Sequence, residues 1–420
     1  MDCIINVQDQ ARRKSLWRSP DFLKLWTGQT ISELGSRITR EGLPLTAVLV
    51  LGATPQQMGF LAATGAGAVL LFGLVAGVWA DRVRRRPILI GMDLIRAALL
   101  ATIPAAAFAH RLTMGQLYAV IALTGVCTVF FDVAYQSYLP SLVERDELLE
   151  GNSKLAQSSA VAEIAGPGLT GVLVQLISAP IAILFDALSF LVSAFSVGMI
   201  RRPEPRPEPA PAQHLREETL AGIRFIFANP LLRPIACFSA CAFLFWGFMG
   251  TLYVLYAIRE LRLPPAALGV AIAMGGAGAM LGATVGPRIG RALGLGWTFI
   301  AAMAVVVCSQ TLIVLAHGPV AMVLAFLMVQ QLFGDAGFAT FNIHEMALRQ
   351  SVAPGPVLGR VNAAMQLLTR GIYPLGALAG GVLAQHIGLR ATLATSIAGV
   401  ALSTLWLLAS PLRRVREIPN

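Results

Sequence analysis

Three charged residues stand at four-residue spacing inside an apolar stretch near the start of the chain. Glu33, Arg37 and Glu41 would lie along one face of a helix as an acid, a base and an acid, with Arg40 beside them. A charged side chain within a bilayer is costly unless it meets a partner or water. A carboxylate beside an arginine can bind a proton and a substrate alternately. The spacing therefore predicts ion-coupled binding, and a permanently paired structural strut is the alternative.

The depth of these charges supports this interpretation. Counted at about 1.5 Å per residue from Phe22, Arg37 lies about 22 Å into an apolar layer that is about 30 Å thick. Glu33, one turn earlier, therefore lies close to the midplane, and Arg37 lies beyond it. By contrast, Asp93 and Asp186 are expected near the ends of their own apolar stretches, where structural roles are predicted.

Four more charged residues lie within apolar stretches. Glu163 and Arg370 are expected at similar depths in two equivalent helices, and we expect them to pair across the centre of the molecule. Asp132 and Asp335 lie nearer to the ends of their helices. For these two acids, a cavity role and a structural role are equally open.

The elements that position these residues are predicted to be membrane-spanning helices. Of the 420 residues, 56% are hydrophobic and 13% are charged, whereas soluble domains carry about 25% charged residues. The apolar runs are continuous rather than alternating, which excludes a transmembrane barrel. At about 20 residues per span, the runs predict twelve helices, at residues 22–51, 58–80, 87–109, 115–138, 152–178, 180–200, 231–258, 265–287, 295–316, 318–343, 358–385 and 390–411.

The positions of the basic residues explain the net charge of +10 by membrane topology rather than by nucleic-acid binding. With twelve helices, 24 of the 32 Lys and Arg residues fall on the side of the two termini. The opposite side has four, which are Arg111, Arg259, Arg262 and Arg390. The positive-inside rule therefore predicts that both termini are cytoplasmic.

An internal duplication organises the chain. An offset of 210 residues places Gly59 on Gly269 and Gly171 on Gly381, among other matches. Two parallel repeats of six helices are the plan of a two-half transporter. We therefore expect an all-α membrane fold with an N-terminal half at residues 1–200 and a C-terminal half with a basic tail at residues 231–420.

The halves are joined by a proline-rich segment, predicted at residues 201–230. Proline occupies every second position from Pro203 to Pro211, which favours an extended spacer over a helix. The following stretch, Leu215 to Ala228, is amphipathic and is predicted to lie on the cytoplasmic membrane surface. We expect the proline-rich run to act only as a spacer.

The turn after the second predicted helix carries a distinctive spacing of glycine, acid and bases, formed by Gly77, Asp81, Arg82, Arg85 and Arg86. This pattern resembles the signature between helices two and three of the major facilitator superfamily. It favours a cytoplasmic gate, because Asp81 can sit at a helix N-terminus and the arginines can pair with acids across the seam in one state. The alternative is that the arginines only anchor this turn on the cytoplasmic side of the membrane. Arg84 stands where the superfamily often has glycine, and the equivalent turn at residues 286–291 lacks the acid.

The fifth predicted helix contains a second motif, formed by Gly166, Pro167, Gly168 and Gly171. It resembles the glycine- and proline-rich motif that marks antiporters of the same superfamily. Its spacing also matches a dinucleotide fingerprint, but no strand precedes it. Over nearly the whole chain, the sequence is similar to the macrolide-efflux and enterobactin-exporter branch. This resemblance implies export of drugs, siderophores or lipids.

These features together predict a proton-coupled exporter of an amphipathic drug or siderophore in the bacterial inner membrane. The chain has no phosphate-binding loop and no paired metal-binding histidines, so we expect neither a cofactor nor a metal nor enzymatic activity. The expected partners are a small molecule, H⁺ and the bilayer, without nucleic acid, and the expected functional unit is a monomer. A lipid flippase or uptake symporter of the same fold and a non-transporting membrane sensor are the alternatives.

Overall fold

The computed structural model describes residues 16–80, 83–204 and 215–417 of the chain. This part of the chain forms helices and contains no strand. The α-helices are α1 (Pro20–Leu49), α2 (Pro55–Ala80), α3 (Arg85–Phe108), α4 (Met114–Leu142), α5 (Leu148–Leu176), α6 (Ala179–Gly198), α7 (Leu215–Ala228), α8 (Leu232–Arg259), α9 (Pro265–Leu293), α10 (Leu295–Leu315), α11 (Val320–Val352), α12 (Gly355–Arg370), α13 (Tyr373–Ile387) and α14 (Leu389–Ala409).

Ten stretches within the described residues are long and apolar enough to cross a membrane. Helix α1 is also long, at 30 residues, but it does not qualify by composition. It carries six charged residues, namely Asp21, Lys24, Glu33, Arg37, Arg40 and Glu41. The prediction of an all-helical fold is therefore confirmed for the described residues, and the least apolar long helix is the one that holds Glu33, Arg37, Arg40 and Glu41.

The predicted helix at residues 358–385 is interrupted. Helix α12 ends at Arg370, Gly371 and Ile372 form a turn, and α13 begins at Tyr373 with Pro374 in its first turn. Proline lacks an N–H and clashes with the carbonyl four residues earlier, so a continuous helix through Pro374 is disfavoured. The apolar pattern alone did not reveal this break.

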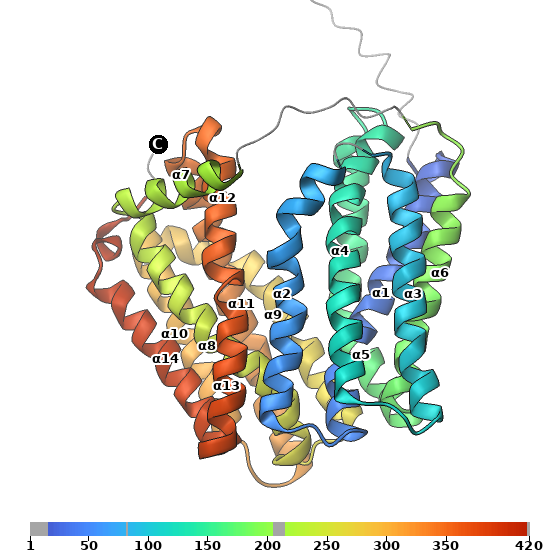
Figure 1. The fold of residues 1–420 in the computed structure, drawn as a ribbon. Coiled ribbons are helices and arrows are strands. Elements are labelled where there is room, and N and C mark those ends of the chain that lie inside the picture. The colour runs from blue at the N-terminus through green and yellow to red at the C-terminus, as the bar shows by residue number, and fades with distance from the viewer. Residues whose placement is uncertain (1–15, 81–82, 205–214, 418–420) are drawn as a thin grey trace, which may run out of the picture.

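The helices form two groups that lie side by side in Figure 1, α1–α6 in one and α8–α14 in the other. Within the first group α1 packs on α5 and α6, and α3 packs on α4 and α6; within the second, α11 packs on α9 and α10, and α8 packs on α13 and α14. The groups meet mainly where α5 contacts α9 and α2 contacts α13. We call the end at which α1 begins and α14 ends the terminal face, and the opposite end the distal face.

Glycines allow the two groups to approach closely near the distal face. A Cβ on Gly171 of α5 would lie 3.1 Å from the Cα of Gly269 in α9, and a Cβ on Gly381 of α13 would lie 3.0 Å from the Cα of Gly59 in α2. These two crossings are related by the 210-residue offset, because Gly59 corresponds to Gly269 and Gly171 to Gly381. Backbones can touch in this way only where side chains are absent.

Helix α7 packs against the second group. The side chain of Ile226 is fully buried, and a Cβ on Gly222 would meet the backbone of Arg360 in α12. At the other end of the linker, Glu204 binds the start of α3 through its carboxylate. The start of the proline-rich run thus contacts the first group through Glu204, residues 205–214 lie outside the described residues, and the role of the run as a spacer stays a prediction.

Candidate functional site

Arg37 forms the centre of an ion-pair network between α1 and α5. Its guanidinium lies 2.9 Å from Glu33 on the preceding turn of α1, and its other terminal nitrogen pairs with Glu163 of α5. The Arg37 side chain is 16% exposed, while those of Glu33 and Glu163 are 37% and 49% exposed. One partly buried cation is therefore shared by two carboxylates that are more exposed to solvent.

The helix-five motif makes room for this arginine. A Cβ on Gly166 would lie 3.0 Å from the Cγ of Arg37 and still closer to its Cβ. Pro167 and Gly171 of the same motif contact Gly269 of α9, whereas Gly168 faces open space. The motif therefore serves two contacts, one with the charged network and one with the crossing near the distal face.

Arg40 and Glu41 extend the network toward the distal face. The Nη1 atom of Arg40 lies 3.7 Å from Glu163, and its Nε lies 4.0 Å from Glu41. Arg40 is 63% exposed and Glu41 is 19% exposed. Glu41 lines a small cavity with Gly171 and Gly269, so a carboxylate lies directly at the crossing of α5 and α9.

The expected pairing of Glu163 with Arg370 is wrong. Arg370 is exposed at the end of α12, and the cations within ion-pair distance of Glu163 are Arg37 and Arg40. The 210-residue offset relates equivalent positions in the two repeats, and equivalence does not imply contact. Across the seam α5 meets α9, and α13 meets α2.

Asp132 and Asp335 border the same central region from two other helices. Asp132 of α4 is exposed and interacts electrostatically with Glu33 and with Arg96 of α3. Asp335 of α11 is half-buried beside Gly275 of α9 and interacts electrostatically with Glu163 and Arg40. Neither acid forms an ion pair within 4 Å in the described part of the chain. Both are therefore available to a charged ligand or a proton.

A polar cavity of about 330 Å³ lies beside Glu33. Its residues come from the first part of α1, the last part of α4 and the first part of α5, so it lies toward the terminal face. Apart from Glu33, the polar side chains that line the cavity are uncharged. They are Gln29, Thr30, Tyr135, Gln136, Asn152, Ser158 and Ser159. They were not predicted from the sequence, where only charged residues were considered as candidates. The sequence of α5 did contain an indication of the cavity, because the spacing of Asn152 and Ser159 places them on one face of a helix.

Asp93 and Asp186 lie within their helices and are buried, at 0% and 1% exposure, rather than near span ends. Asp93 pairs with Arg96, whose guanidinium lies 4.3 Å from the ring centre of Phe131 and 4.0 Å from that of Phe190. Asp186 instead accepts a hydrogen bond from the Ser189 hydroxyl at 3.1 Å. The first acid neutralises a buried cation, and the second is held by a neutral donor.

We expect Asp93→Asn to destabilise the protein by about 3–5 kcal/mol, because it leaves the Arg96 charge buried without its partner. Asp186→Asn is the matched control, since asparagine keeps an acceptor for Ser189 and leaves no cation unpaired. Thermal unfolding of the purified variants in detergent measures both changes. Equal losses in the two variants would contradict the assignment of a special role to the Asp93–Arg96 pair.

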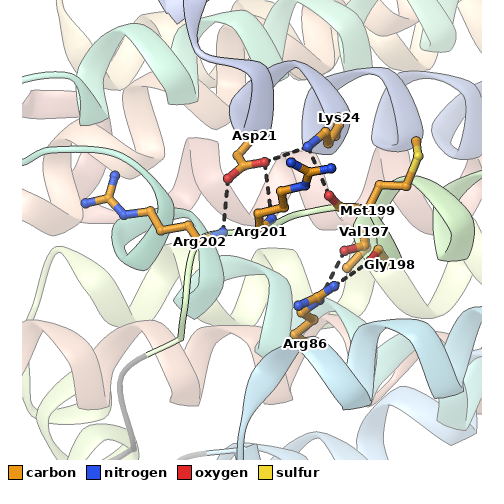
Figure 2. Close-up of polar contacts among 8 residues, drawn as sticks. All are labelled: Asp21, Lys24, Arg86, Val197, Gly198, Met199, Arg201 and Arg202. Carbon is orange, nitrogen blue, oxygen red and sulfur yellow. Dashed lines mark hydrogen bonds and ion pairs between the residues drawn. The ribbon is translucent and has the colours of Figure 1, made fainter.

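The arginines of the predicted gate turn are bound within the first helix group. Arg86 donates to the carbonyl oxygens of Val197, at 3.2 Å, and Gly198 at the end of α6 (Figure 2). Arg85 lies 3.9 Å from Glu204. Among the described residues neither arginine pairs with an acid of the second group, so the expected bridge across the seam is not made here. Asp81 and Arg82 lie outside the described residues, and of Gly77 only its place in α2 is described.

A second set of contacts holds the end of α6 and the start of the linker to α1. Asp21 accepts hydrogen bonds from the backbone N–H groups of Arg201 and Arg202 at 3.3 and 3.0 Å, and Lys24 donates to Asp21 and to the carbonyl of Met199 (Figure 2). The guanidinium of Arg202 also donates to Leu142 at the end of α4. Residues 197–204 are thereby fixed across the terminal ends of α1, α3, α4 and α6.

The sequence of the whole chain matches a known family. A profile described as transmembrane secretion effector covers residues 15–419. The chain belongs to the major facilitator superfamily. This membership confirms the resemblance to the superfamily, and it makes the chain a multi-pass membrane transporter.

Several members of the superfamily are similar to this chain over nearly its full length. An MFS-type transporter of Bacillus subtilis is 26% identical, with 96% of each chain covered. A multidrug efflux pump of Mycolicibacterium fortuitum is 27% identical over 96% of this chain and 97% of its own. An enterobactin exporter of Escherichia coli O1:K1 is 23% identical over 99% of this chain and 98% of its own.

Solved structures of the superfamily share the fold. A bacterial homologue of the iron transporter ferroportin in its inward-facing state superposes with a TM-score of 0.72 at 21% identity, covering 93% of this chain and 98% of the other. The outward-facing state of such a homologue gives a TM-score of 0.55 at 20% identity, with 93% and 98% covered.

Proposed function

We propose that this superfamily member is a proton-coupled exporter of an amphipathic small molecule, such as a drug or a siderophore, and that it works by alternating access in the bacterial inner membrane. The observation that carries the proposal is the Glu33–Arg37–Glu163 network, which lies in membrane helices beside a polar cavity. Similarity to a multidrug pump and to an enterobactin exporter supports export of this class of molecule.

The proposed transporter comprises twelve membrane-spanning helices in two halves, residues 1–200 and 231–420, with both termini in the cytoplasm. The distribution of Lys and Arg supports this orientation. The glycine crossings bring the halves together near the distal face, and the polar cavity lies toward the terminal face. Together with the higher TM-score to an inward-facing state, these features support an inward-facing conformation.

Coupling follows from the sharing of Arg37. With Glu33 and Glu163 ionised, the triad carries a net negative charge. A proton on either carboxylate neutralises that excess and weakens its bond to Arg37. When a substrate displaces that proton, the carboxylate is ionised again and its ion pair with Arg37 is restored. Proton and substrate therefore compete for one network, and such competition is the requirement for exchange.

The test is substrate-dependent collapse of a pH gradient in proteoliposomes, measured across macrolides, siderophores and lysolipids. We expect a macrolide or a siderophore to collapse the gradient. Flux without movement of protons would contradict proton coupling. Absence of flux for every compound, in protein that binds at least one of them, would favour the membrane sensor.

A lipid substrate is the second candidate, favoured by an apolar groove of about 650 Å³ between α2, α8 and α13. The groove is lined by exposed side chains that include Phe60, Leu375 and Val382. Movement of a labelled lysolipid between leaflets by the same proteoliposomes, without macrolide or siderophore transport, would favour this function.

A further inference from the structure

The polar cavity beside Glu33 is formed by one helix group. Among the described residues, those that line it belong to α1, α4 and α5, and none belongs to α8–α14. A ligand bound there contacts the first group alone. The chemistry of this one wall therefore decides which part of a substrate the cavity accepts.

Several hydrogen-bonding groups of the cavity have no partner in the protein. Thr30 donates to the hydroxyl of Ser158 at 3.0 Å, so these two side chains satisfy each other in part. By contrast, the side chains of Tyr135, Gln136 and Ser159 form no hydrogen bond within the described part of the chain. Polar groups that the fold leaves unpaired beside a cavity are free to bind a ligand or water.

The charges around the cavity disfavour an ionised ligand group. No Lys or Arg lines it within the described residues, and its one charged residue is Glu33. A carboxylate or phosphate is normally recognised by arginine or lysine, and here it would lie beside an acid instead. An ammonium group would have to compete with Arg37, which already pairs with Glu33 at 2.9 Å. The cavity therefore favours an uncharged polar group.

The remaining side chains match the surface of a sugar ring. Amide and hydroxyl side chains both donate and accept hydrogen bonds, as sugar hydroxyls require. The ring of Tyr135, which stacks on Phe131 with 6.0 Å between ring centres, and the side chains of Leu139 and Leu155 supply apolar surface for the C–H groups of such a ring. The volume of about 330 Å³ is at the lower end for ligand cavities, so it suits one ring of a larger molecule.

We propose that the cavity binds the neutral, hydroxyl-rich end of an amphipathic glycoside, while the apolar remainder of the molecule extends beyond it. The inference rests on the proposed export function, and it narrows the substrate class to molecules that carry an uncharged sugar. A sugar hydroxyl can donate a hydrogen bond to ionised Glu33. A neutral substrate is thereby able to compete with a proton for this carboxylate.

The first test compares three ligands that share a hexyl chain and differ in the polar end. Hexyl β-D-glucoside, hexyl β-D-glucuronide and a hexyl triethylene glycol ether are titrated by calorimetry into the parent protein in lipid nanodiscs. The glucoside is expected to bind at least about tenfold more tightly than the glucuronide, whose carboxylate lies beside Glu33. It should also bind about tenfold more tightly than the ether, which has a single hydroxyl donor. A glucuronide or an ether that binds as tightly as the glucoside would overturn the proposal.

The second test uses matched pairs of variants on α5. Asn152→Ala and Ser159→Ala remove an amide and a hydroxyl from the cavity wall, whereas Gln157→Ala and Ser153→Ala remove the same groups from the same helix outside the cavity. Each of the first two variants is expected to weaken glucoside binding by about three- to tenfold, and the other two should match the parent. Equal losses in both pairs, or no loss in the first pair, would show that the sugar does not occupy this cavity.

Both tests measure binding and need neither a pH gradient nor flux. If a siderophore without a sugar collapses the gradient in proteoliposomes while the glucoside does not bind, the sugar site is wrong and the proposed export function stands. If the glucoside binds as expected and no compound is transported, export is contradicted and the sugar site stands.

Discussion

Replacing Glu33 with glutamine is expected to abolish proton-driven transport while substrate binding is kept. Glutamine cannot release a proton, so the triad can no longer exchange one charge for another, although its amide still fits beside Arg37. Binding is measured by tryptophan fluorescence or calorimetry, and coupling by collapse of a pH gradient in proteoliposomes. The expected result is the parent affinity with no substrate-dependent movement of protons.

The matched variants are Glu163→Gln and Arg37→Ala. Glu163 shares the same guanidinium from α5 and is more exposed than Glu33, so its loss is expected to weaken coupling without removing it. Arg37→Ala leaves two carboxylates without their common partner, and we expect loss of coupling together with about 1–3 kcal/mol of stability. If Glu33→Gln transports against a gradient as well as the parent, the assignment is wrong and Glu163 or Asp132 becomes the better candidate.

Adding a single methyl group at either glycine crossing is expected to stop transport. The Cβ of Gly171→Ala would lie 3.0 Å from the Cα of Ala266 and closer to the carbonyl of Pro265. Neither is the end of a flexible side chain, so α5 and α9 must separate. Gly381→Ala meets the same obstacle between α13 and α2, where its Cβ would lie 2.7 Å from the carbonyl of Pro55.

Both variants should therefore favour a state with an open distal face, and their effects should be alike because the 210-residue repeat relates the two crossings. Distances between spin labels on the distal loops measure the shift, and transport is measured in the same preparations. Gly168→Ala is the control, since it lies in the same motif but nothing is within 4 Å of its added Cβ. Transport at the parent rate in Gly171→Ala would show that the crossing does not restrict opening.

Much of the architecture could be predicted from local sequence. Apolar run length and the positions of proline and glycine placed most helix ends within a few residues of those observed, because these properties act through the backbone of the segment itself. The spacing of Glu33 and Arg37 likewise predicted their pairing, since residues four apart share a helix face. The break at Gly371 was missed because apolar residues occur on both sides of it, and hydropathy by itself does not show that Pro374 disfavours a continuous helix.

The contacts between distant helices were decided only by tertiary structure. The sequence supplied Glu163 but not the choice between Arg37 and Arg370 as its partner, because that choice depends on which helices cross at that depth. Glu204 reads as part of a spacer, and its role as a cap for α3 exists only because the end of α6 lies beside the start of α3. Local periodicity determines which face of a helix is polar, whereas tertiary packing determines which neighbouring helix that face contacts.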